Sequence, residues 1–296
     1  MRVNSRGSEP TQRSTGGLSL QLKLTTQAKK VESVSVSLLQ LYESRSNRAI
    51  LSYRAQAGDL RLARLRRANS EESLFEPKVE ILPRSQRTIW DELKATPRHF
   101  VLYGGTAIAL RLGHRQSEDF DFFSNEAFQP AALIEAVGYL KQARIDQRGD
   151  NTLTVVTDRG GPVRISYFGG LGMNHVHEPD LAADNGLQIA SLLDLAATKL
   201  KTIQQRAEAK DYRDIDAVLG SGVSLPEGLA AAVAVYGKAF NPLMALKALS
   251  YFKDGNLPSL SSEIQARLLK AVNMVKLEGL PRLTAKPGIA RSGSSI

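Results

Sequence analysis

The chain has 296 residues, 42% of them hydrophobic and 23% charged, which is the composition of an ordinary globular protein with room for one to three compact units. It contains no cysteine, so disulfides, thiolate zinc sites and a cysteine nucleophile are excluded. No stretch approaches the roughly 18 consecutive apolar residues of a membrane-spanning helix. The N-terminal segment lacks the apolar core of a secretory signal, which makes the cytoplasm the expected location.

The net charge of +9 is unevenly distributed along the chain. Residues 1–73 contain 13 Lys and Arg against 6 Asp and Glu, and residues 276–296 contain 4 against 1. Residues 74–275, with 22 against 23, are nearly neutral. Bulk charge therefore gives no reason to treat the middle of the chain as a nucleic-acid-binding protein.

The first 73 residues have the pattern of a basic, poorly ordered extension. Residues 1–17 are rich in Ser, Gly, Arg and Thr, a composition typical of disorder. Residues 18–73 first alternate like a short strand and then suggest two short helices. Their basic run RLARLRR (61–67) fits a solvated helix or disordered arm, or else an arm that binds nucleic acid. The first interpretation is favoured because basic runs are usually solvated.

From Ser73 onward the pattern predicts alternating helices and strands. In chain order these are an extended piece between Pro77 and Pro83, a helix over 85–95, a strand over 99–105, a helix over 106–114, a strand over 117–123, a helix over 129–143, and three strands over 143–170. Gly113 is predicted to end the second helix and Pro130 to begin the third.

Beyond residue 180 the sequence predicts mainly helices. A polar loop over 180–185 is followed by one long helix or two consecutive helices over 186–222, by helices over 225–240, 241–252 and 262–280, and by a frayed tail. If 186–222 forms two helices, the second is expected to begin near Asp211. The expected organisation is α+β, with an N-terminal extension (1–73), a core of mixed sheet and helices (74–185), a helical unit (186–280) and a flexible tail (281–296).

Two acidic residues, Asp119 and Asp121, interrupt an apolar run in the strand over 117–123. Because alternate residues of a strand share a face, the two carboxylates lie side by side with Ser117, while Phe120 and Phe122 point into the core. Neighbouring carboxylates repel each other and raise each other's pKa, a cost that a bound Mg²⁺ removes. The alternative is an exposed edge strand with inert acids.

A glycine pair, Gly104 and Gly105, lies where the preceding strand meets its helix. Without a Cβ these residues allow a phosphate to approach the backbone N–H groups at the helix N-terminus, and Thr106 adds a hydroxyl there. Alone, the pair would indicate only a tight turn. Together with acids on the next strand, it is the arrangement needed to hold a nucleoside triphosphate (NTP) with its Mg²⁺.

These residues have the spacing G-G-T, twelve residues, then D-x-D, which resembles the signature of the nucleotidyltransferase superfamily. Within that superfamily, GGTAIALRLGHRQSEDFDFF (104–123) resembles the AbiEii/AbiGii toxin family. A second block, DLAATKLKTIQQRAEAKDYRDIDAVL (194–219), resembles that family's D-L-x-A-x-K…R-x-x-x-K-D-x-x-D block. The resemblance covers roughly residues 75–252 and leaves out 1–73.

The resemblance implies a polymerase-beta-like nucleotidyltransferase fold and a toxin-like enzyme that transfers a nucleotide from an NTP to an acceptor hydroxyl. It implies Mg²⁺ or Mn²⁺ as cofactor, RNA (in some members tRNA) as acceptor, a cognate antitoxin as partner and a role in phage defence. The expected metal ligands are Asp119 and Asp121; the expected nucleotide-binding residues are Gly104, Gly105, Thr106, Arg115, Ser117 and Lys199; and the expected catalytic residues are Asp119, Asp121, Lys199 and Asp211.

One departure from the superfamily pattern concerns a third carboxylate on a later strand. The corresponding strand is VRISYFGG, whose candidate positions are Arg164, Ser166 and Phe168, and none of these is acidic. The general base is therefore expected elsewhere, at Asp211, or the reaction depends on substrate alignment alone. Arg115 could contact a phosphate, pair with Glu118 or face solvent.

Other functions remain open at this stage. A phosphotransferase or kinase-like enzyme could use the same phosphate-binding turn, and a non-catalytic NTP-binding protein could keep the fold. His175 and His177, with Glu178 and Asp180 nearby, could bind zinc, but a loop without metal is the favoured interpretation because no further spaced ligand follows. His114 is expected to be a surface residue at the end of a helix.

Overall fold

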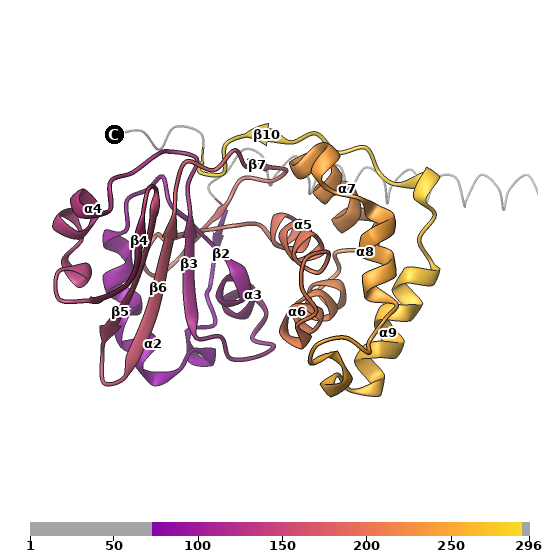
Figure 1. Ribbon diagram of the computed structural model, residues 1–296, viewed down its shortest axis with the longest axis horizontal. Helices are drawn as coiled ribbons and strands as arrows, with labels where there is room; N and C mark the ends of the chain where they lie inside the picture. The colour runs from indigo at the N-terminus through magenta and orange to yellow at the C-terminus, as the bar shows by residue number, and fades with distance from the viewer. Residues whose placement is uncertain (1–72, 292–296) are drawn as a thin grey trace, which may run out of the picture. The chain divides into compact units, whose positions relative to one another are not determined.

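A mixed sheet is the centre of the described chain, which comprises residues 73–291 of a computed structural model (Figure 1). Contacts divide the chain into two units, Met1–Ala68 and Asn69–Ile296, and the described residues all belong to the second. The predictions made for residues 1–72 lie outside the described residues.

The sheet contains eight strands within residues 73–291, and their spatial order differs from their order in the chain. From edge to edge the strands are β1 (Leu74–Phe75), β8 (Asp180–Ala182), β9 (Gln188–Ile189), β2 (Val101–Tyr103), β3 (Asp119–Phe123), β6 (Pro162–Phe168), β5 (Thr152–Asp158) and β4 (Arg144–Gly149). β3 runs antiparallel to β2 and parallel to β6. The predicted mixed sheet is therefore confirmed, and β3 lies well inside it, away from the edge.

Strand alternation divides the β3 residues between core and pocket. Phe120 and Phe122 are fully buried, and their rings stack on Trp90 and Tyr167 respectively. Asp119 and Asp121 lie on the opposite face, where Asp119 is exposed and Asp121 partly buried. The period of two predicted this division, because burying the aromatic rings forces the carboxylates away from the core.

Helices accompany the sheet and then form a second core. The α-helices are α2 (Arg84–Ile89), α3 (Gly104–Leu112), α4 (Pro130–Ala136), α5 (Leu192–Thr202), α6 (Ala209–Gly220), α7 (Leu225–Tyr236), α8 (Pro242–Leu249) and α9 (Ser262–Asn273). Short 3-10 turns cover Val79–Ile81, Trp90–Ala95, Gly138–Leu140, Gly237–Ala239, Leu257–Ser259 and Leu277–Gly279. Helices α5 and α6 contact α3, and α5 also contacts α7, so they join the sheet to the remaining helices (Figure 1).

Local sequence signals account for several helix ends. Gly113 ends α3 in the left-handed conformation, with φ of 65°, as its position predicted. The hydroxyl of Ser191 accepts a hydrogen bond from the backbone N–H of Asp194 at the start of α5. Ser224 and Glu227 form a capping box at the start of α7. Of these caps, Gly113 fixes the end of α3 and Ser191 the start of α5, and both of these helices contribute to the site.

The structure corrects several predicted elements. The piece between Pro77 and Pro83 contains a 3-10 turn rather than an extended segment, and the predicted loop 180–185 contains strand β8, because Leu181 and Ala182 pair with β1. The segment 186–222 begins with strand β9 and then forms two helices, so the alternative with two helices is confirmed from Leu192 onward. The predicted flexible tail contains strand β10 (Lys286–Pro287), which pairs with β7 (Asn174–His175).

No single helix within residues 73–291 is long and apolar enough to span a membrane. One pair of segments, Ala209–Gly220 and Leu225–Ala239, meets the length and composition criteria jointly, and it is bent by 115°.

Candidate active site

The turn between β2 and α3 is open because neither of its first two residues has a side chain. Gly104 has a φ of 78°, and a Cβ built on it would lie 2.8 Å from Oδ2 of Asp121. A Cβ on Gly105 would collide with the guanidinium of Arg115 and lie 3.1 Å from Oγ of Ser117. Two glycines are therefore needed for the helix N-terminus to approach the acids of β3 and the side chains of the following loop.

The two carboxylates of β3 have no side-chain partner among residues 73–291. The register places Asp119 beside Arg164 and Asp121 beside Ser166 of β6, so no acid stands at the position of a third strand carboxylate. Burial, together with the charge of Asp119, raises the pKa of Asp121 above its ordinary value. The pair thus concentrates negative charge, which the more distant cations Lys199, Lys210 and Arg164 offset only in part.

The residues present fit a divalent cation held partly by substrate. No group of three or more His, Asp or Glu side chains in the described part of the chain is arranged to hold a metal ion. Mg²⁺, however, is usually bound by one or two carboxylates, with substrate phosphates and water completing its coordination. Asp119 and Asp121 supply the two carboxylates, and the glycine turn beside Asp121 leaves room for phosphates.

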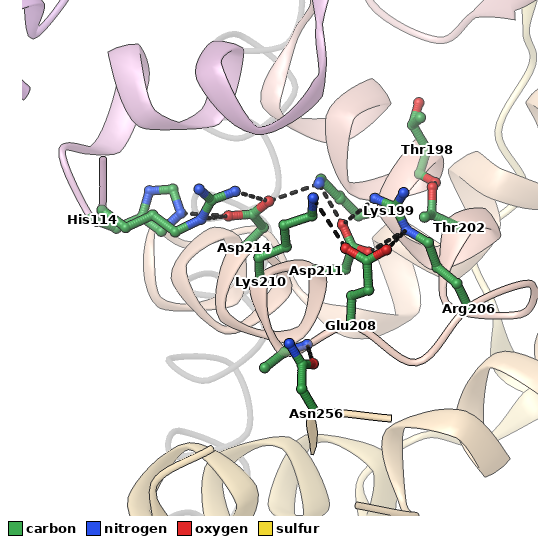
Figure 2. A network of polar contacts seen from close by, with 12 residues as sticks. His114, Thr198, Lys199, Thr202, Arg206, Glu208, Lys210, Asp211, Asp214 and Asn256 are labelled. Atoms are coloured by element: carbon green, nitrogen blue, oxygen red, sulfur yellow. Dashed lines mark hydrogen bonds and ion pairs between the residues drawn. The ribbon is translucent and has the colours of Figure 1, made fainter. Parts of the chain in front are cut away.

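Lys199 of α5 is held between two carboxylates of α6, as Figure 2 shows. Its Nζ lies 2.7 Å from Oδ1 of Asp211 and 2.7 Å from Oδ2 of Asp214. The Lys199 side chain is buried, and both acids are fully buried. An ammonium group has three N–H donors, so one remains to face the pocket. The arrangement fixes a lysine that would otherwise be flexible.

Asp214 also anchors the loop between α3 and β3. Its carboxylate accepts two hydrogen bonds from Arg115, of 2.6 and 2.9 Å, and lies 2.7 Å from Nε2 of His114. Burial alone would raise the pKa of Asp214, but the hydrogen bonds from His114 and Arg115 and the charge of Lys199 hold it well below its usual range. Arg115 therefore pairs with Asp214, not with Glu118, and His114 is partly buried rather than a surface residue.

Asp211 lies on the other side of the Lys199 ammonium group from Asp214. Besides Lys199, it accepts hydrogen bonds of 2.9 and 3.3 Å from Arg206, in the segment between α5 and α6. Burial raises the pKa of Asp211, but these two cations outweigh burial and leave the pKa below its ordinary value. Asp211 and Asp214 thus pair with cations from other elements, and not with neighbours on their own helix.

A pocket of about 580 Å³ brings these groups together, a size typical of small-molecule sites. Seven of the predicted site residues line it: Gly104, Gly105, Arg115, Ser117, Asp119, Asp121 and Lys199. Two do not. Thr106 is fully buried and its hydroxyl donates to the backbone carbonyl of Asp119 over 2.5 Å, and Asp211 lies behind Lys199.

Sequence reasoning missed several residues of the pocket wall. They are Gln116, Glu118, Phe123, Phe168, Thr198, Thr202, Gln205, Arg206 and Lys210. Arg206 and Lys210 could have been found, because both belong to the R-x-x-x-K-D block. Thr198 and Thr202 lie beside Lys199 on α5, one turn apart, so helix periodicity indicates them once Lys199 is placed.

The H-x-H pair takes part in contacts within the fold. His175 is buried in β7, and its Nδ1 lies 2.6 Å from the carbonyl oxygen of Gly288. Glu178 pairs with Lys286, so the contacts of His175 and Glu178 attach residues 286–288 to the rest of the chain. Asp180 pairs with Arg111 of α3.

A model of the family described as "Nucleotidyl transferase AbiEii toxin, Type IV TA system" matches residues 90–278, which is more than half of the chain. The chain therefore belongs to the AbiEii family of nucleotidyltransferase toxins. The resemblance noted from the two sequence motifs is confirmed.

One curated protein is similar to part of this chain, and several solved structures are similar to it at low sequence identity. An uncharacterized protein of Aquifex aeolicus (strain VF5) is 32% identical over 118 residues, which are 39% of this chain and 55% of the relative, so the chain spans about half the length of that curated relative. Among solved structures, MenT4, a nucleotidyltransferase toxin from Mycobacterium tuberculosis H37Rv, is 15% identical with a TM-score of 0.48, covering 66% of this chain and 83% of that one. A putative nucleotidyltransferase from H. pylori is 17% identical with a TM-score of 0.43, covering 64% and 91%.

Proposed function

We propose that this chain transfers a nucleotide from an NTP to an acceptor hydroxyl in a reaction that requires Mg²⁺ or Mn²⁺. The observation that carries this proposal is the position of Asp121, whose carboxylate lies against Gly104 at the N-terminus of α3 and has no side-chain partner within residues 73–291. Membership of a nucleotidyltransferase toxin family supports the same reaction.

The chain's own residues would bind and orient the triphosphate. Gly104 and Gly105 line the pocket at the N-terminus of α3, and anions are stabilised by the backbone N–H groups at a helix N-terminus. Lys199 and Arg115, each held by Asp214, place positive charge on the pocket wall in fixed positions. The metal, held by Asp119 and Asp121, would neutralise phosphate charge at the reacting centre.

The acceptor hydroxyl must lose its proton, and Asp211 is poorly suited to take it. Its carboxylate is fully buried, and Lys199 and Arg206 hold its pKa below the ordinary value. We assign Asp211 as a positioning residue for these two cations. Glu118 is exposed and lines the pocket next to Asp119, so it is the pocket carboxylate left to accept a proton. Alignment and charge neutralisation would supply most of the catalysis.

The proposal includes an acceptor class and a protein partner. The acceptor is RNA, with tRNA as one candidate, as the resemblance of the sequence motifs implies, and a type IV toxin–antitoxin family supports a cognate antitoxin as partner. Both belong to the proposal.

The experiment is incubation of the protein with each labelled NTP, Mg²⁺ and total RNA, with measurement of labelled RNA and released pyrophosphate. Asp121→Asn should abolish labelling without changing the thermal melting temperature, because Asn keeps the shape of the side chain and removes its charge. Asp150→Asn, an exposed acid in the turn between β4 and β5, is the matched control and should label normally.

Three outcomes would contradict the proposal. Undiminished labelling by the Asp121→Asn protein would show that Asp121 is not a ligand of the catalytic metal. Release of a nucleoside diphosphate in place of pyrophosphate would indicate a phosphotransferase. NTP binding without turnover of any acceptor would indicate a binding protein that has kept the fold.

A further inference from the structure

Phe168, the last residue of β6, is an aromatic side chain in a pocket otherwise dominated by charge. It lines the pocket and is only partly buried. It belongs to neither of the two hydrophobic cores in residues 73–291, although Phe123 beside it packs against the first. Its ring meets that of Phe123 edge to face, with centroids 5.5 Å apart and planes at 80°. Core packing therefore does not account for Phe168.

The register of β3 and β6 places this aromatic pair next to the acids. Asp121 pairs with Ser166, and two residues further along Phe123 pairs with Phe168. Side chains two residues apart on a strand share a face, so the rings and the carboxylates face the same pocket. The separation along the strand is roughly 7 Å, which the ribose between an α-phosphate and its base can bridge.

The two directions away from Asp121 differ in chemistry. Toward the start of the strands, the register places Asp119 beside Arg164, whose side chain is 50% exposed and lies 3.4 Å from the carboxylate of Asp146. Toward the end of the strands, the side chains that line the pocket are the aromatic pair Phe123 and Phe168. A nucleobase has a π-face that stacks on aromatic rings whatever its identity.

We propose that Phe168, supported by Phe123, is the stacking platform for the nucleobase of the donor NTP. The proposal rests on the proposed function, and adds to it the residue that binds the nucleoside end of the substrate. The triphosphate then lies over Gly104 and Gly105, and the base lies at the ends of β3 and β6.

The test compares NTP with inorganic tripolyphosphate, which has the charges of the donor but no base. Calorimetric titrations in Mg²⁺ are carried out with the wild-type protein and with Phe168→Leu, Phe168→Tyr and the control Phe75→Leu. Phe75 is a partly buried phenylalanine of β1 outside the pocket. Phe168→Leu should bind NTP about tenfold more weakly and tripolyphosphate with unchanged affinity. Phe168→Tyr and Phe75→Leu should behave like the wild type for both.

Each remaining outcome overturns the proposal. Equal NTP affinity of the wild-type and Phe168→Leu proteins would show that Phe168 does not bind the base of the donor NTP. The proposed function would be unaffected by this result. Equal weakening of NTP and tripolyphosphate would indicate a distorted phosphate site. If Phe168→Leu leaves NTP binding unchanged but weakens binding in an additional titration with a short oligoribonucleotide, Phe168 contacts the acceptor. Absence of Mg²⁺-dependent NTP binding by the wild-type protein would overturn both this proposal and the proposed function.

Discussion

Asp214 connects three side chains from two separate segments, which makes it the most connected acid of the site. Its carboxylate contacts Arg115 and His114, which lie in the loop before β3, and forms an ion pair with Lys199 of α5. A buried carboxylate with such partners is costly to disturb, because removing its charge leaves buried cations without compensation. The side chains that would contact phosphate are thus rigid before any substrate binds.

We predict that Asp214→Asn lowers the free energy of unfolding by roughly 3 kcal/mol and weakens NTP binding. Urea denaturation at pH 7 measures the first effect and calorimetric titration the second. Asp216→Asn is the matched control, because Asp216 lies on the same helix and pairs with Arg267, whose side chain is 58% exposed. The control should change little, and an equal loss in both variants would contradict the assigned role.

The pH dependence of the same variant tests the electrostatic cause. A carboxylate whose folded-state pKa is lowered stabilises the fold above its unfolded-state pKa of about 3.9, and this contribution declines as the pH falls through the folded-state value. The pKa of Asp214 is held well below that range. The difference in unfolding free energy between the wild-type and Asp214→Asn proteins should therefore shrink from pH 7 to pH 3. A constant difference would point to packing as the cause.

At the scale of single elements, the turn between β2 and α3 brings the site together because its glycines let side chains approach. Gly104 needs its positive φ, and Gly105 makes room for Arg115 and Ser117. Thr106 then joins the helix to β3 through its hydrogen bond to the carbonyl of Asp119. The turn therefore sets the distance between the helix N-terminus and the carboxylates.

We predict that Gly105→Ala abolishes NTP binding and also lowers the thermal melting temperature. The added Cβ meets the guanidinium of Arg115, and moving that side chain takes a cation from the pocket and breaks its hydrogen bonds to the buried Asp214. Gly138→Ala is the control, since nothing lies within 4 Å of a Cβ there. Binding of NTP with wild-type affinity by the Gly105→Ala protein, measured by calorimetry, would show that the turn does not contact the triphosphate.

Strong local signals predicted the elements near the site well. Alternation of apolar and acidic residues identified β3, and Gly113 marked the end of α3. The sequence did not predict strand β8, because Asp180–Ala182 is short and lies in a segment that resembles a polar loop. The segment is a strand only because it pairs with β1 and β9. A two- or three-residue strand has too few positions for its period to be visible in the sequence.

At the scale of the whole described unit, residues 286–289 pack onto the sheet and its hydrophobic core. Ile289 is 1% exposed and belongs to the sheet's hydrophobic core. Strand β10 pairs with β7, and Lys286 forms an ion pair with Glu178. The prediction of a flexible tail failed over this part because small, polar and proline residues dominate it, and its one buried isoleucine gives no periodic pattern.

We predict that Ile289→Ala lowers the free energy of unfolding by about 2–4 kcal/mol. Ile145→Ala on the edge strand β4, where the side chain is 45% exposed, should have a much smaller effect. Urea denaturation of both variants measures the difference. Equal effects would show that the end of the chain does not contribute to the core.

The sequence by itself determined the short-range part of this protein: the glycine turn, the two acids on one strand face, the family and the mixed sheet followed by helices. These depend on residues close together in the chain, where period and spacing are readable. Only the tertiary structure decided that Asp211 and Asp214 hold Lys199, and that Phe168 lines the same pocket. Asp214 lies 99 residues from Arg115, and no local pattern encodes which distant charges a buried carboxylate will meet. That choice is made by the packing of α3, α5 and α6 against one another.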